Sequence, residues 1–134
     1  MKYKIWQPTG TVKNTLYDIL SINDVYDGFF ISLVDDENQK LTLTWHGIVV
    51  SYMRASEETR FRFISNEWQD LRRQNGDWSF YEVENSDFCA WIQRESEGMI
   101  DVNNLHHLMI ITKNDVLDVV SYDYPKATSE NQFS

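Results

Sequence analysis

Histidine and cysteine are the side chains that could bind a metal or exchange protons near neutral pH. The 134-residue sequence contains three histidines and one cysteine. Two of the histidines are adjacent, at His106 and His107, and neighbouring residues of a strand point to opposite faces of a sheet. One metal ion is therefore difficult to hold with both, and no Cys-x-x-Cys or His-x-His spacing occurs. We expect no metal site, with one histidine at the core edge and the other on the surface.

A general acid/base pair is a second kind of chemistry to consider. His46 could combine with the adjacent histidines and with Glu57 or Glu58, but proton transfer requires a geometry that spacing alone does not show. The simpler interpretation places His46 in a tight turn beside Gly47. We predict no catalytic residue.

Cys89 is the one residue that could act as a thiolate nucleophile. It follows Ser86, which is a good helix N-cap, and a helix N-terminus lowers a thiol pKa. Its neighbours Phe88, Ala90 and Trp91 instead favour a small buried apolar side chain. The acidic residues have no calcium-loop spacing, and the five glycines form no phosphate-binding loop. We expect no cofactor.

The formal net charge of −9 indicates what the protein binds. An acidic surface repels phosphate backbones, so nucleic acid is not an expected partner, and it attracts basic proteins. Charged residues lie on expected turns and strand ends, where a partner can reach them. The residues predicted to bind such a partner are Asp35, Asp36, Glu37, Tyr52, Arg54, Glu82 and Glu84. The alternative is that the charge serves solubility only.

Chain length and apolar content predict one domain outside the membrane. At 134 residues the chain fits the size of a single domain. No stretch reaches the roughly 18 apolar residues of a membrane span, and the first ten residues lack a signal-peptide core. A lone cysteine fits a reducing compartment, so we expect a cytoplasmic protein. Its oligomeric state does not follow from the sequence. Residues 125–134 are polar and expected to fray.

Period-two alternation over residues 29–54 predicts the centre of the fold. Three runs of β-branched and aromatic residues, separated by polar or Gly punctuation, predict three strands that pair antiparallel as a meander. Other patterns predict strands at 2–6, 60–64, 78–83, 107–111 and 116–122, helices at 14–22 and 87–97, and a loop or irregular helical turn at 66–76.

The expected fold class is α+β. About six to seven strands form one mostly antiparallel sheet, and about two helices pack on one of its faces. The core is expected to contain Phe29, Ile31, Leu43 and Trp91.

Short segments spread over most of the chain resemble a group of small acidic proteins from Gram-positive bacteria. The resembling residues are 26–28, 52–54 with Glu57 and Arg60, 80–86, 106–107 and 112–115. Some proteins of that group lie near polymorphic toxins and are suspected immunity proteins. The resemblance implies a single non-enzymatic domain, and it transfers no functional residue.

Two functions follow from these observations. The first is a cytoplasmic interaction protein, such as an immunity-type inhibitor of a basic toxin. The second is a small-ligand-binding protein or enzyme with a pocket between sheet and helices. Convergence of His46, Tyr52 and Arg54 in a pocket would favour the second, and a flat acidic face the first.

Overall fold

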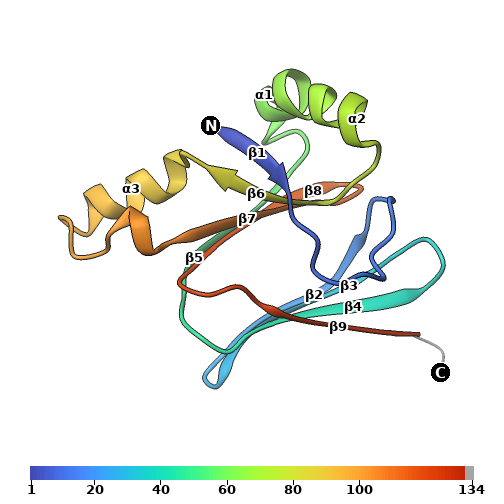
Figure 1. The fold of residues 1–134 in the computed structure, drawn as a ribbon, viewed down its shortest axis with the longest axis horizontal. Helices are drawn as coiled ribbons and strands as arrows, with labels where there is room; N and C mark the ends of the chain where they lie inside the picture. Colours follow the sequence, from blue (N-terminus) through green and yellow to red (C-terminus); the bar gives the residue numbers. More distant parts are fainter. Residues whose placement is uncertain (132–134) are drawn as a thin grey trace.

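Two antiparallel sheets and a helical layer make up the protein. The computed structural model describes residues 1–131. One sheet has the strand order β1 (Lys2–Ile5), β6 (Phe80–Glu84), β7 (His106–Ile111), β8 (Asp115–Ser121) and β5 (Val49–Ser56). The other has the order β2 (Asp18–Val25), β3 (Gly28–Val34), β4 (Gln39–Trp45) and β9 (Lys126–Asn131). Figure 1 shows the helices above the five-stranded sheet and the four-stranded sheet below it.

The main core lies between the two sheets. On β3 and β4 alternate residues are buried, and Ile31 pairs with Leu43 at the centre of the hairpin. Strands β7 and β8 are covered by helices on one face and by the second sheet on the other. Because both of their faces are buried, their sequences are nearly continuous apolar runs. A hydrogen bond from Trp45 Nε1 to Ser121 Oγ, at 3.1 Å, links the sheets.

The α+β class is confirmed, but the prediction of one sheet with six to seven strands is wrong. Strands β3 and β4 form the expected hairpin, whereas β4 and β5 belong to different sheets. The link through Gly47 therefore crosses between the sheets. A Cβ atom at Gly47 would lie 2.4 Å from Asp123 Oδ2, so a larger residue at this crossing would displace the Asp123 side chain.

The helix predicted over 14–22 is wrong, because Asp18–Val25 forms strand β2. The register against β3 shifts between Ile19 and Ser21. This bulge breaks the period-two pattern and leaves Leu20 44% exposed. The resulting apolar spacing resembles that of a helix.

The strand predicted over 60–64 is also wrong. A continuous helical segment begins there, as α1 (Phe61–Phe63), a π-helical turn η1 (Ile64–Trp68) and α2 (Gln69–Asn75). Phe61 is 68% exposed, whereas Phe63, Trp68 and Leu71 are buried. The wider π turn places Phe63 and Trp68, five residues apart, toward the sheet. The sequence predicted only a loop or one irregular helical turn, over residues 66–76.

Helix α3 (Asp87–Glu95) confirms the predicted helix, with Ser86 as its N-cap. The helix ends two residues earlier than expected. Glu97 occupies the left-handed C′ position at φ 52°, and Gly98 N–H bonds to Gln93 O one residue later. Cys89 and Ile92 face the core, whereas Trp91 is 48% exposed, so its predicted burial is wrong. The other three predicted core residues are buried.

The remaining strand predictions at 2–6, 78–83, 107–111 and 116–122 are confirmed to within two residues by β1, β6, β7 and β8. The tail was expected to fray over 125–134, but Lys126–Asn131 forms β9 and pairs with β4. The last three residues of that prediction lie outside the described residues. Among residues 1–131, no helix is long and apolar enough to cross a membrane.

Candidate functional site

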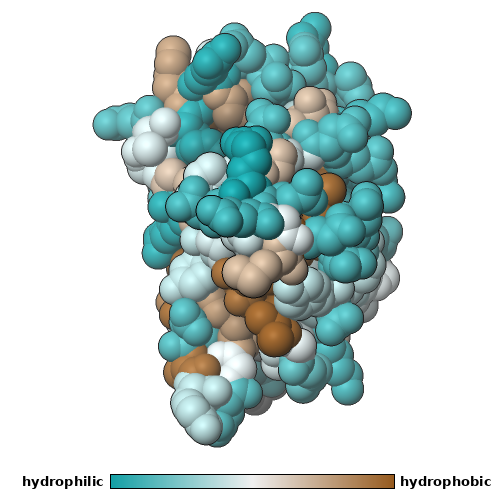
Figure 2. Space-filling view, turned by 90° about the vertical axis from the view of Figure 1, so that its left-hand side faces the viewer, coloured by the Kyte–Doolittle hydropathy of each residue, from teal (hydrophilic) through white to brown (hydrophobic). Residues whose placement is uncertain are grey.

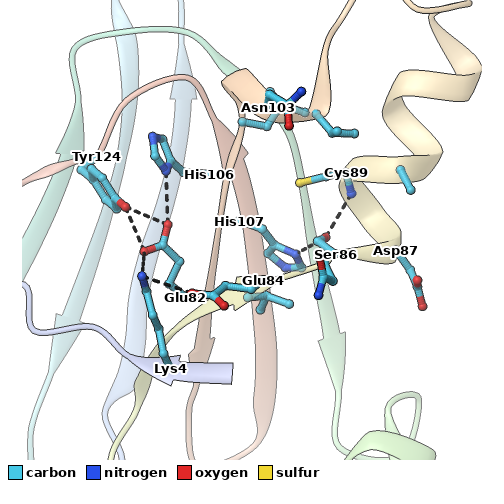
Figure 3. A pocket seen from close by; sticks show the side chains of 15 residues that line it. Lys4, Glu82, Glu84, Ser86, Asp87, Cys89, Asn103, His106, His107 and Tyr124 are labelled. Carbon is cyan, nitrogen blue, oxygen red and sulfur yellow. Dashed lines mark hydrogen bonds and ion pairs between the residues drawn. The ribbon is translucent and has the colours of Figure 1, made fainter. Parts of the chain in front are cut away.

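Strands β6 and β7 separate at one end of the five-stranded sheet. Their pairing stops at Glu82 and Leu108. Beyond this point β6 turns through Asn85, at φ 52°, into the N-cap of α3. A hollow of about 630 Å³ opens between the two chain segments, and we call it the Ser86 hollow (Figure 3). Its lining comes from β1, β6, β7, the start of α3, residues 102–105 and the segment before β9.

A line of buried polar side chains lies on the helix side of the sheet. Ser86 Oγ is 2.6 Å from His107 Nδ1, and His107 Nε2 is 2.7 Å from Asp118 Oδ1. Arg60 donates a 2.5 Å hydrogen bond to the other carboxylate oxygen of Asp118. Ser86, His107 and Asp118 are 9%, 6% and 1% exposed. These contacts join α3, β7, β8 and the residue before α1.

The hydrogen-bond partners define the proton positions in this line. A carboxylate only accepts hydrogen bonds, so His107 Nε2 carries the proton that Asp118 accepts. In the neutral ring Nδ1 is then an acceptor, and the hydroxyl of Ser86 donates to it. Ser86 Oγ also accepts the N–H of Cys89 at 3.0 Å, as an N-cap does. Each polar group in the line therefore has a partner.

His106 lies on the opposite face of the same sheet, as Figure 3 shows. Its Nδ1 is 3.2 Å from Glu82 Oε2, and its ring lies 4.2 Å from that of Tyr124. Tyr124 donates its hydroxyl to the Glu82 carboxylate, and Lys4 contacts Glu82 and Glu84. Partial burial, together with the nearby Glu82 carboxylate, raises the pKa of Tyr124 to about 12. The prediction that one histidine lies at the core edge and the other on the surface holds only in part, because His107 is 6% exposed whereas His106 is half-buried.

Cys89 faces the core beside Ile92 and Val120. Burial raises the pKa of its thiol, and this outweighs the opposite effect of the neighbouring Ser86 hydroxyl. A raised pKa disfavours the thiolate that a nucleophile requires. Among residues 1–131, no group of three or more His, Cys, Asp or Glu side chains is arranged to hold a metal ion.

A second hollow, of about 620 Å³, lies between β5 and α3, and we call it the Trp91 hollow. Its lining is mostly apolar, with Met53 from the edge strand β5 and Phe88 and Trp91 from α3. The phenyl ring of Phe88 lies 6.2 Å from the indole of Trp91. The buried side chains of His107 and Asp118 also line this hollow. An apolar cavity with a few converging polar groups is typical of a binding site.

Among the exposed side chains that form no ion pair, carboxylates outnumber basic groups. Within residues 1–131, eleven exposed carboxylates form no ion pair, whereas only four exposed basic side chains form none. The carboxylates are those of Asp24, Asp27, Asp36, Glu57, Glu58, Glu67, Asp87, Glu95, Glu97, Asp101 and Asp123. The basic side chains are those of Lys2, Arg62, Arg94 and Lys126. Figure 2 views the side on which α3 projects, and its surface is mostly hydrophilic with a small hydrophobic group lower down. Asp87, Trp91 and Glu95 follow i, i+4, i+8 spacing, so they share one face of α3.

The residues predicted to bind a partner lie in three separate places. Asp35 is 5% exposed and accepts hydrogen bonds from the backbone N–H groups of Glu37 and Gln39, so it stabilises the hairpin rather than contacting solvent. Asp36 and Glu37 are exposed on the same hairpin, where Glu37 contacts Lys13.

The remaining predicted residues lie on the five-stranded sheet. Glu82 and Glu84 line the Ser86 hollow, and Tyr52 lines the Trp91 hollow. The Tyr52 ring lies 4.8 Å from that of Phe29, and Arg54 is paired with Asp115 at 2.8 Å. The binding role of these residues stays a prediction.

His46 does not converge with Tyr52 and Arg54. It is exposed in the turn after β4, as expected, and lines a third hollow with Val25 and Ile48. The contacts among Ser86, His107, Asp118 and Arg60 did not follow from the sequence. One signal was present, since Asp118 is a lone charge within the apolar run of β8, and such a residue needs a buried partner.

Comparison of the chain with protein-family models, with curated proteins and with solved structures gives no match. The function is therefore inferred from the geometry of the two hollows.

Proposed function

We propose that this protein is an interaction protein that binds a basic segment of a protein partner, with an apolar anchor residue, at the Trp91 hollow. The observation that carries the proposal is the 48% exposure of Trp91 between two acidic residues, Asp87 and Glu95, at the rim of an apolar cavity. This position combines an aromatic anchor, a cavity and uncompensated negative charge.

The apolar part of the site suits a side-chain anchor. Tryptophan dominates the binding energy of many interfaces when a partner covers it. Met1 and Met53 are 59% and 42% exposed at the same hollow, and methionine adapts its shape to different partners. Burying Trp91 and these methionines would remove an exposed apolar surface that folding leaves in water.

The charged part of the site selects a cationic partner. Asp87 and Glu95 are exposed on α3, and Glu97 and Asp101 follow it along the chain. Arg94 is the basic residue of α3, so the carboxylates outnumber it. Complementary charge speeds encounter and disfavours acidic partners. An immunity-type inhibitor that binds a basic toxin in the cytoplasm is a protein class with this charge arrangement.

The test is selection of peptides from a random 12-residue display library on immobilised wild-type protein. We expect the selected peptides to combine Lys or Arg with an aromatic or large aliphatic residue. Trp91→Ala should weaken their binding at least tenfold, because it removes the anchor. Phe61→Ala is the matched control, since Phe61 is a 68% exposed aromatic residue outside the lining of the hollow, and it should leave binding unchanged.

Selected peptides without basic residues, or equal binding to Trp91→Ala and wild type, would contradict the proposal. A second candidate is a small apolar ligand, which the cavity volume of about 620 Å³ favours, since ligand pockets span roughly 300–1,000 Å³. A thermal-shift screen with small apolar compounds separates the two. A hit that Trp91→Ala abolishes, with no peptide selected, would favour the small ligand.

A further inference from the structure

Beyond partner binding, we propose that Ser86 is a nucleophile, activated by His107 and Asp118, that takes an acyl group from a short-chain carboxylic ester in the Ser86 hollow. Ser86 and His107 both line this hollow (Figure 3). The partner site at Trp91 neither requires this activity nor is required by it.

The distances are those of a serine, histidine and aspartate relay, but the two ring nitrogens are exchanged relative to the usual arrangement, in which Nε2 faces the serine. Ser86 Oγ to His107 Nδ1 is 2.6 Å, and His107 Nε2 to Asp118 Oδ1 is 2.7 Å. Such a relay is recognised by geometry and roles rather than by sequence order. The Asp118 carboxylate accepts the Nε2 proton and so leaves Nδ1 free to act as a base. Arg60 holds the second oxygen of Asp118, which fixes the carboxylate in place.

The position of Ser86 also suits a nucleophile. It lies on the short turn that joins strand β6 to helix α3. The Cys89 N–H donates to Oγ and stabilises negative charge as the hydroxyl proton leaves. The N–H groups of Asp87 and Phe88 belong to the first turn of α3 and have no acceptor within the helix. Unpaired backbone N–H groups of this kind are the donors that stabilise an oxyanion.

The proposed reaction is the hydrolysis of an ester, in which water is the second reactant. As the Ser86 Oγ–carbon bond forms, the hydroxyl proton passes to His107 Nδ1. Collapse of the tetrahedral intermediate breaks the ester C–O bond, and the same proton passes to the leaving alcohol. Water then attacks the acyl-serine, gives a proton to Nδ1, and releases the carboxylic acid while Oγ recovers its proton.

The lining of the hollow limits the substrate. Its volume of about 630 Å³ fits a small ester, and Val83, Ala90 and Leu105 supply apolar contacts for a short acyl chain. Three carboxylates lie in the lining against the single cation Lys4, so a negatively charged ester is disfavoured; the carboxylates are those of Glu82, Glu84 and Asp87. The substrate class is a neutral or cationic short-chain ester.

The test is covalent labelling of the full chain with a neutral alkyl fluorophosphonate, read by intact mass and peptide mapping. The Ser86 Oγ–phosphorus bond forms as fluoride leaves, so we expect one adduct per chain on the peptide that contains Ser86. Ser86→Asn should give no adduct, and it remains folded because asparagine is also a good N-cap. Ser65→Ala, which changes an exposed serine of the π-helical turn, should label as wild type does.

In the labelling assay, His107→Gln should lower the rate of adduct formation at least tenfold. Hydrolysis of p-nitrophenyl acetate provides the second readout. Asp118 is a positioning residue, so Asp118→Asn should lower kcat and leave KM unchanged at a temperature where near-ultraviolet circular dichroism shows a folded protein. Absence of an adduct on folded wild-type protein, or an adduct that persists in Ser86→Asn, would overturn the proposal and leave the partner site unaffected.

Discussion

The ion pair between Arg60 and Asp118 should contribute more to stability than any exposed ion pair of the protein. The carboxylate of Asp118 is 2% exposed and the Arg60 side chain 22% exposed. Removing one partner of a buried pair costs about 3–5 kcal/mol, because an uncompensated charge remains. His107 still donates to Asp118 and Arg60 is part-exposed, so we place Arg60→Met at the lower end, about 3 kcal/mol.

Arg54→Met is the matched control for this prediction. Arg54 pairs with Asp115 at 2.8 Å, but their side chains are 49% and 19% exposed. An exposed pair contributes at most about 1 kcal/mol. In urea unfolding, with a slope of about 2 kcal/mol per molar, the midpoints of the two variants should differ by about 1 M, and Arg60→Met should be the less stable.

A double-mutant cycle separates the charge from the packing of Arg60 on the Phe63 ring, which lies 5.2 Å away. With Asp118→Asn already present, no buried carboxylate is left unpaired, and Arg60→Met should then cost about 1 kcal/mol or less. Equal costs in the two backgrounds would refute the reasoning, as would equal midpoints for Arg60→Met and Arg54→Met.

Three further predictions follow from burial. Trp91→Ala should cost about 1 kcal/mol in the free protein, because the indole is half exposed, whereas Trp45→Ala should cost about 3–5 kcal/mol; equal costs in urea unfolding would place Trp91 in the core. Burial is the main cause that raises the pKa of Tyr3 and of Tyr124 to about 12, so the unfolded chain loses these protons first. The resulting stability is complete below pH 10 and is lost as pH rises toward 12; thermal unfolding of Tyr124→Phe should show a smaller loss, and an unchanged profile would contradict this. The buried Cys89 thiol, with its raised pKa, should react with a disulfide reagent at pH 8 far more slowly in the folded protein than in urea; equal rates would show an accessible thiol.

Local patterns predicted the parts of the fold in which each strand has one buried face. The hairpin of β3 and β4 alternates strictly, so its strands and buried residues followed from the sequence. The bulge in β2 inserts one residue into a regular repeat and so produced a false helix, and the alternation of the exposed Phe61 and the buried Phe63 with two arginines produced a false strand. The division into two sheets depends on the path of the chain at Gly47 and on contacts distant in sequence, such as Trp45 with Ser121.

The candidate site was less predictable than the fold. Ser86 was identified as an N-cap, but its contact with His107 spans 21 residues and that of Arg60 with Asp118 spans 58. Spacing in a sequence carries no information about such pairs. Trp91 was assigned to the core because it follows Phe88 at i+3, and the structure places it at the border of the buried face of α3.

The central claim is that a cationic peptide binds beside α3, and nuclear magnetic resonance tests it most directly. Titrating the isotope-labelled protein with the strongest selected peptide should shift the backbone amides of Asp87–Glu95 and of Val50–Met53. Neutralising Asp87→Asn with Glu95→Gln should weaken the binding, whereas the matched pair of Asp24→Asn, at the exposed end of β2, and Asp27→Asn, in the turn that follows, should not. Shifts confined to that turn, or equal affinities for the two double variants, would contradict the claim.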